Sequence, residues 1–211
     1  MHIKKAEYII SSPSFEKCPA PDKPEYAFIG RSNVGKSSLI NMICNNDKLA
    51  KTSNSPGKTQ LINHFEIRSV PKAGEHNETK WYLVDLPGYG FAKVSQSSRR
   101  RWEQMIENYL RKIENLINVF ILIDSRHSPQ KIDLEFIQKL RLWEVPYTLV
   151  FTKSDKEKQR VVSKNVKSFL ETLRQTQQFL PRHFVTSSIK KTGREKILDL
   201  ISEKNDDVKT R

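Results

Sequence analysis

The sequence predicts an α/β fold of three layers: a mostly parallel sheet of six to seven strands, with helices on both faces and one antiparallel edge strand. Short apolar runs alternate along the chain with longer segments whose apolar residues recur at helical spacing. Residues 118–124 and 146–151 are apolar at nearly every position, which is typical of strands covered on both faces. Residues 64–70 and 80–85, joined by a turn containing Pro and Gly, predict the antiparallel edge.

Each element has a local justification. Residues 26–29 form a short apolar run, and 38–43 repeat apolar residues at helical spacing, so a strand and a helix flank residues 30–37. An apolar stripe follows Gly193 in the last helix. The expected strands are 6–11, 25–29, 64–70, 80–85, 118–124, 146–151 and 183–187. The expected helices are 36–44, 98–114, 131–143, 156–177 and 194–204.

We expect one domain over residues 1–204 and a disordered tail over 205–211. Two cysteines, Cys18 and Cys44, give neither a disulfide framework nor metal-ligand spacing. No apolar run approaches the roughly 18 residues of a membrane span, and the N-terminus lacks a signal-peptide core. These features predict a cytoplasmic protein without stable membrane association, and nothing in the sequence requires more than a monomer.

The formal net charge of +13 lies mostly in the second half of the chain. Residues 1–89 hold 12 Lys and Arg against 9 Asp and Glu, whereas 90–211 hold 25 against 15. A solvated surface can carry such a charge, and so can a protein that binds an anionic membrane. A nucleic acid or nucleoprotein partner is the interpretation that the size of the excess favours.

The most informative segment is Gly-Arg-Ser-Asn-Val-Gly-Lys-Ser at residues 30–37, which fills the phosphate-loop pattern G-x-x-x-x-G-K-[ST] at every fixed position. Backbone N–H groups of such a loop point inward at a helix start, where they can cradle phosphate oxygens. Lys36 is expected to reach the β- and γ-phosphates, and Ser37 to place its hydroxyl on Mg²⁺. The candidate phosphate-binding residues are Gly30, Arg31, Ser32, Asn33, Val34, Gly35, Lys36, Ser37 and Ser38.

Asp85-Leu86-Pro87-Gly88 directly follows an apolar strand. An Asp at a strand end after a phosphate loop typically holds Mg²⁺, here through water, and Gly88 lets its backbone N–H approach the γ-phosphate. A third candidate segment lies between these two motifs, at Gly57-Lys58-Thr59. Thr59 could give Mg²⁺ a second hydroxyl only while the γ-phosphate is present, which would make this loop a switch.

Thr152-Lys153-Ser154-Asp155 ends another buried strand. The Asp155 carboxylate can accept hydrogen bonds from N1–H and N2–H₂ of guanine, a donor pair that adenine lacks, and Lys153 can cover the purine with its aliphatic stem. Thr186-Ser187-Ser188 ends the last strand and fits a loop behind the base. The site would then bind GTP or GDP, although an ATPase and a P-loop phosphotransferase remain alternative functions.

The segments at residues 30–41, 55–60, 85–90 and 152–155, in this order, resemble Era/EngA-like GTPases, and most closely the EngB (YihA/YsxC) family. The run from Asp85 through Ala92, Asp-Leu-Pro-Gly-Tyr-Gly-Phe-Ala, is the most distinctive part of a resemblance that covers roughly residues 1–202. It implies a P-loop GTPase (Ras-like) fold, dependence on Mg²⁺, a role in assembly of the large ribosomal subunit, and a link to cell division and septation. A septum- or membrane-associated regulatory GTPase that does not bind ribosomes is the alternative.

The resemblance also bears on catalysis. The expected catalytic residues are Lys36, Thr59, Gly88 and Asn33, with Mg²⁺ on Ser37, Thr59 and Asp85. Ras-type enzymes place a water-orienting Gln after the equivalent of Gly88, where this chain has Tyr89, so slow turnover is expected. Related GTPases with Asn at the position of Asn33 bind K⁺ there. Thr152 stands where the family usually has Asn, and we expect a weaker brace on the phosphate loop as a result.

Overall fold

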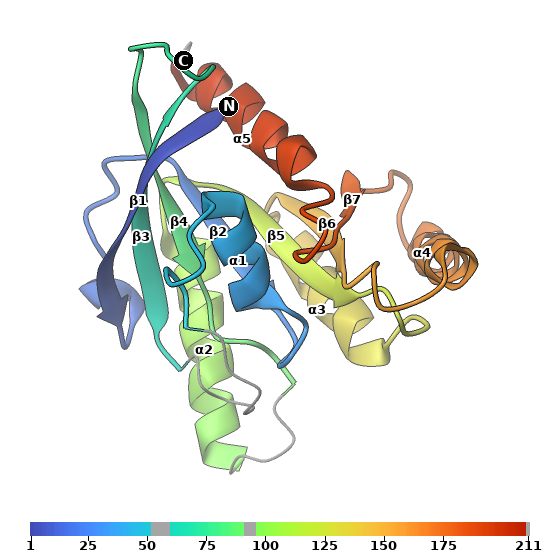
Figure 1. Ribbon diagram of the computed structural model, residues 1–211. Coiled ribbons are helices and arrows are strands. Elements are labelled where there is room, and N and C mark those ends of the chain that lie inside the picture. The colour runs from blue at the N-terminus through green and yellow to red at the C-terminus, as the bar shows by residue number, and fades with distance from the viewer. Residues whose placement is uncertain (52–59, 91–95, 210–211) are drawn as a thin grey trace.

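The computed structural model describes residues 1–51, 60–90 and 96–209, which fold around a seven-stranded sheet of order β1-β3-β4-β2-β5-β6-β7 (Figure 1). The strands are β1 (His2–Ser12), β2 (Glu25–Gly30), β3 (Ile62–Val70), β4 (Thr79–Asp85), β5 (Leu116–Asp124), β6 (Tyr147–Thr152) and β7 (His183–Val185). The helices are α1 (Lys36–Cys44), α2 (Gln96–Lys112), α3 (Lys131–Leu142), α4 (Gln159–Arg174) and α5 (Arg194–Lys209), with a 3₁₀ turn η1 (Phe15–Lys17).

The predicted mostly parallel sheet with an antiparallel edge is confirmed. Strands β4, β2, β5, β6 and β7 pair in parallel, whereas β3 is antiparallel to both β4 and β1. The expected hairpin is β3–β4, with Asn63 opposite Asp85 and Ser69 opposite Thr79. Outermost is β1, which is longer than predicted and carries register shifts at Ile3/Lys5 and Tyr8/Ile10, a common feature of edge strands.

Helices cover both faces of the sheet, as predicted. On one face α1 and α5 pack over the aromatic side chains of β2 and β5, where Phe28 and Phe120 stack with ring centroids 4.7 Å apart. On the other face α2, α3 and α4 form a second core, in which Phe169 meets Phe151 edge to face. Because both faces are buried, β2 and β5 are apolar at almost every position, and their carboxyl ends open onto one edge.

The prediction of a disordered tail from residue 205 is wrong for the residues that the structure describes. Helix α5 continues to Lys209 and ends five residues beyond its expected end at 204. Asn205 is 3% exposed and its Oδ1 accepts a hydrogen bond of 2.8 Å from the Tyr26 hydroxyl on β2. This buried contact anchors the additional turn to the sheet, and a polar composition alone could not reveal it. In the described part of the chain, no helix combines the length and apolarity needed to cross a bilayer.

Candidate nucleotide-binding site

The phosphate-loop segment connects β2 to α1 through two residues with positive φ, Asn33 at 62° and Gly35 at 98°. Gly35 is the N-cap residue of α1, and its left-handed conformation suits glycine. Within the described residues, the N–H groups of Gly35, Lys36 and Ser37 have no acceptor on the protein. These are the donors that an α-helix leaves unsatisfied at its N-terminus, and together with the helix dipole they favour an anion.

The end of β4 lies against this loop. A Cβ atom at Gly88 would be 2.7 Å from the Gly30 carbonyl oxygen, so only glycine permits this approach. The backbones of Arg31 and Tyr89 form a parallel bridge immediately beyond. Leu86 turns its side chain into the core, while its N–H bonds to the Phe28 carbonyl at 3.0 Å. The expected juxtaposition of residues 30–38 with Asp85, Leu86, Pro87 and Gly88 is therefore present.

Inside the site, the Lys36 ammonium donates a hydrogen bond to Oδ1 of Asp85. Lys36 is 9% exposed and Asp85 is 3% exposed, and these two buried charges form an ion pair with each other. Burial of either charge alone would be costly, and the pairing offsets that cost. The two groups expected to meet phosphate and metal thus already lie together at the end of the loop.

The expected base-reading loop is tied to the phosphate loop at two points. The Thr152 hydroxyl lies 2.6 Å from the Val34 carbonyl oxygen and 3.2 Å from that of Ile123. The Lys153 ammonium bonds to the Asn33 carbonyl at 2.6 Å and to Oδ2 of Asp124 at 2.9 Å. A brace on the phosphate loop is therefore present despite the departure from Asn, because the Thr hydroxyl reaches the loop itself.

Asp155 lies beside the last strand. Its Oδ1 accepts a hydrogen bond of 2.6 Å from the hydroxyl of Ser187, and this bond is the main reason that the pKa of Asp155 is lowered. The Ser154 N–H bonds to the Thr186 carbonyl at 3.1 Å, which joins the two loops. Asp155 is therefore ionised at neutral pH, and its other oxygen, Oδ2, lies 3.7 Å from the ammonium of Lys156. The structure brings together Thr152, Lys153, Ser154, Asp155, Thr186, Ser187 and Ser188, as expected.

The candidate switch residues Gly57, Lys58 and Thr59 lie outside the described residues. Arg99 and Arg100 on α2 line a cavity of about 670 Å³ between α2 and α3. Tyr89 and Gly90 line the same cavity, so the basic start of α2 lies close to the segment that follows Gly88.

Two carboxylates at this site were not predicted. Asp124 ends β5, just as Asp85 ends β4, and that equivalence was an available signal. Asp133 is 0% exposed on α3 and accepts hydrogen bonds from Tyr89 and Arg31. Its position three residues before Phe136 and seven before Leu140 places it on the apolar stripe of α3, which indicates a buried acid.

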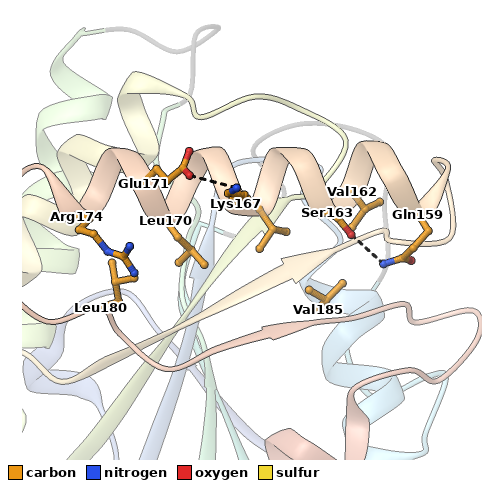
Figure 2. A pocket seen from close by; sticks show the side chains of 10 residues that line it. Gln159, Val162, Ser163, Lys167, Leu170, Glu171, Arg174, Leu180 and Val185 are labelled. Atoms are coloured by element: carbon orange, nitrogen blue, oxygen red, sulfur yellow. Dashed lines mark hydrogen bonds and ion pairs between the residues drawn. The ribbon is translucent and has the colours of Figure 1, made fainter.

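A separate hollow of about 380 Å³ lies between α4 and β7 (Figure 2). Gln159 and Ser163, and Lys167 and Glu171, form polar pairs along α4 above it. None of its lining residues belongs to the loops described above. The apolar part of its wall comprises Val162, Val166, Leu170, Leu180 and Val185.

The fold and the four loops at its carboxyl edge define a GTP-binding protein of the P-loop class. A family model described as "50S ribosome-binding GTPase" matches residues 25–153. The chain belongs to the EngB family of GTP-binding proteins, which its full-length relatives show. It is 50% identical over 209 residues to "Probable GTP-binding protein EngB" of Phocaeicola vulgatus, covering 99% of this chain and 100% of the relative. The protein of the same name from Porphyromonas gingivalis is 49% identical over 211 residues, with both chains covered completely.

Solved structures agree on the fold. A crystal structure of a probable GTP-binding protein EngB covers 87% of this chain and 99% of its own, with a TM-score of 0.59 and 23% identity. The structure of Era in complex with MgGDPNP and nucleotides 1506–1542 of 16S ribosomal RNA covers 86% of this chain and 56% of its own, with a TM-score of 0.68 and 22% identity.

Proposed function

We propose that this protein is a Mg²⁺-dependent GTPase of slow intrinsic turnover that binds the large ribosomal subunit in one nucleotide state. It acts as a monomer in the cytoplasm during subunit assembly, and normal cell division and septation depend on it. The match of residues 25–153 to a 50S ribosome-binding GTPase model carries the ribosomal part of this proposal. The net charge of +13 supports an anionic partner, which we propose to be ribosomal RNA rather than DNA or a membrane.

The residues present fit a magnesium ion. In the described part of the chain, no group of three or more His, Cys, Asp or Glu side chains could hold a metal by itself. One hydroxyl, on Ser37, and one carboxylate, on Asp85, suit Mg²⁺, which keeps several waters and shares the phosphate oxygens of its nucleotide. Thr59 would add a second hydroxyl. When bound, the ion would neutralise charge on the phosphates.

Phosphoryl transfer needs charge stabilisation and a positioned water. Lys36 would exchange the Asp85 carboxylate for β- and γ-phosphate oxygens, while the N–H groups of Gly35 and Gly88 donate to the same phosphates. No water-orienting role falls to Tyr89, because its hydroxyl is bonded to Asp133 inside the protein. That arrangement supports the proposal of slow turnover.

We propose further that K⁺ bound near Asn33 supplies the missing positive charge, as the family resemblance implies. GTP hydrolysis should then be at least several-fold faster in KCl than in NaCl at equal ionic strength. Replacing Asn33 by Ala should remove that difference. Equal rates of the unsubstituted protein in the two salts would refute a role for K⁺.

Co-sedimentation with purified large ribosomal subunits tests the proposed function. The protein is incubated with GDP or with a non-hydrolysable GTP analogue over a salt series, because a basic protein binds RNA non-specifically at low ionic strength. We expect retention with the analogue only, persisting near physiological salt. Binding that is equal with both nucleotides and weakens as the salt concentration rises would reject the ribosomal partner. Retention on anionic vesicles instead would favour the membrane-associated alternative.

A further inference from the structure

One carboxylate oxygen joins the two segments that face the γ-phosphate position. Oδ1 of Asp133 accepts a hydrogen bond of 2.8 Å from the Tyr89 hydroxyl and another of 3.0 Å from Nε of Arg31. Arg31 directly follows Gly30 in the phosphate loop, and Tyr89 directly follows Gly88. Neither segment can move far from the other without breaking one of these bonds.

Helix α3 holds the Tyr89 segment by further contacts. The ring of Tyr89 stacks on Phe136, with centroids 4.3 Å apart and planes 16° apart. Gly90 has a φ of 77° and packs against the side chain of Ile132 on α3. Three successive residues, Gly88 to Gly90, therefore pack between the phosphate loop and α3.

A contribution to folding stability does not explain why a carboxylate occupies position 133. Asp133 is completely buried, and in the described part of the structure its Oδ2 has no hydrogen-bond partner. Burial raises the pKa of Asp133, and the nearby Arg31 guanidinium opposes that rise. Buried ion pairs with an unsatisfied atom often add little to stability compared with an apolar replacement. What the arrangement does specify is the relative position of two loops.

We propose that Asp133 is a positioning residue that holds Gly88 against the phosphate loop and so sets how strongly the site prefers GTP to GDP. This inference rests on the nucleotide switch of the proposed function. Only GTP has a γ-phosphate for the Gly88 N–H to meet. If Gly88 is already in place before the nucleotide binds, less free energy is spent on ordering it when its N–H contacts the γ-phosphate, so the affinity for GTP is higher. The affinity for GDP, which lacks that phosphate, is unchanged.

The variant Tyr89→Phe removes one hydroxyl and leaves the ring on Phe136. Affinities for GDP and for a non-hydrolysable GTP analogue are measured on the full chain with Mg²⁺. We expect the affinity for the analogue to fall about 5- to 10-fold, the scale of one buried hydrogen bond, and that for GDP to change less than about 2-fold. Asp133→Asn, which keeps the size of the side chain, should change the ratio in the same direction.

Tyr109→Phe is the matched control. The Tyr109 hydroxyl also donates to a buried carboxylate, Oε2 of Glu25, at 2.5 Å, but between α2 and β2 and away from the nucleotide loops. This variant should lose a similar amount of thermal stability while the ratio of the two affinities stays at that of the unsubstituted protein.

An unchanged ratio in Tyr89→Phe, with a loss of stability like that of the control, would reduce Asp133 to a structural residue and overturn the proposal. If Asp133→Asn fails to fold, Tyr89→Phe decides alone. The measurement uses purified protein without ribosomes. A shifted ratio without any subunit binding would therefore uphold the coupling and reject only the ribosomal partner. An unsubstituted protein that binds both nucleotides equally would refute both the switch and the inference.

Discussion

The hydroxyl of Thr152 lies 2.6 Å from the carbonyl oxygen of Val34, to which it donates a hydrogen bond. Two loops that are 118 residues apart in the sequence are thereby held at a fixed distance. One has the features of a guanine-recognition loop and the other those of a phosphate loop. The protein therefore holds the loop expected to bind the base at a fixed distance from the loop expected to bind the phosphates.

Replacing Thr152 by Val should lower the affinity for GTP and GDP alike by about 5- to 10-fold, because one buried hydrogen bond worth roughly 1 kcal/mol is lost and the Val34 carbonyl is left unpaired. Equilibrium titration of both nucleotides measures the effect. Thr148→Val is the control, since Thr148 is also buried on β6 and bonds to Asn118 at 3.3 Å, near the beginning of the strand. Equal losses of nucleotide affinity in the two variants would contradict the bracing role.

Gly88→Ala should severely weaken binding of GTP analogues, because the new Cβ would lie 2.7 Å from the Gly30 carbonyl oxygen and 3.4 Å from the Ser32 nitrogen. The two loops must then separate. Gly74→Ala is a useful comparison: its φ of 90° disfavours a side chain, by roughly 1–2 kcal/mol, but no described atom lies within 4 Å. Titration and thermal unfolding should show lost stability in both variants and lost affinity in Gly88→Ala only. Normal analogue binding by Gly88→Ala would rule out the close approach.

Asp124 should make the protein sensitive to acid. Burial alone would raise the pKa of Asp124, but hydrogen bonds from Arg126 and Lys153 outweigh it and hold the pKa well below its usual range. A pKa depressed in the folded state contributes stability above the unfolded value of about 3.9 and loses it as the pH falls. Asp124→Asn should therefore be less stable at pH 7 by about 2 kcal/mol.

Thermal unfolding of both proteins between pH 7 and pH 3 measures this contribution. The difference in stability should be constant down to about pH 5 and shrink below it, as the native carboxylate loses its advantage over the unfolded one. A difference that stays the same down to pH 3 would show that Asp124 contributes by packing and not by charge.

Local patterns made the nucleotide loops predictable. Gly30, Lys36 and Ser37 occupy fixed positions in one contiguous motif, and helix α1 has the predicted bounds because Gly35 and Asn45, both left-handed, cap its two ends. Helix α4 was expected from residue 156 but begins at Gln159, since the N–H of Lys156 bonds to the Lys153 carbonyl in the preceding turn. Motif spacing carries no information about that turn.

Long-range contacts could not be predicted in this way. The role of Asp133 depends on Arg31 and Tyr89, which are 102 and 44 residues away in the sequence. The contact of Thr152 with Val34 is not predictable from the family pattern, which gives a residue type at that position and not a distance. The last turn of α5 is held by the hydroxyl of Tyr26 on β2, and the spacing of apolar residues along the helix gives no indication of this contact. Each of these features comes from tertiary packing.

Titration of GTP, XTP and ATP into the unsubstituted protein and Asp155→Asn tests whether these loops recognise guanine through Asp155. We expect the unsubstituted protein to prefer GTP to the other two by about 100-fold or more, because the wrong base offers the Asp155 carboxylate no matching pair of donors. Asp155→Asn should prefer XTP, since an amide can donate to the O2 carbonyl of xanthine. Unchanged base selectivity in Asp155→Asn would show that Asp155 does not recognise the base.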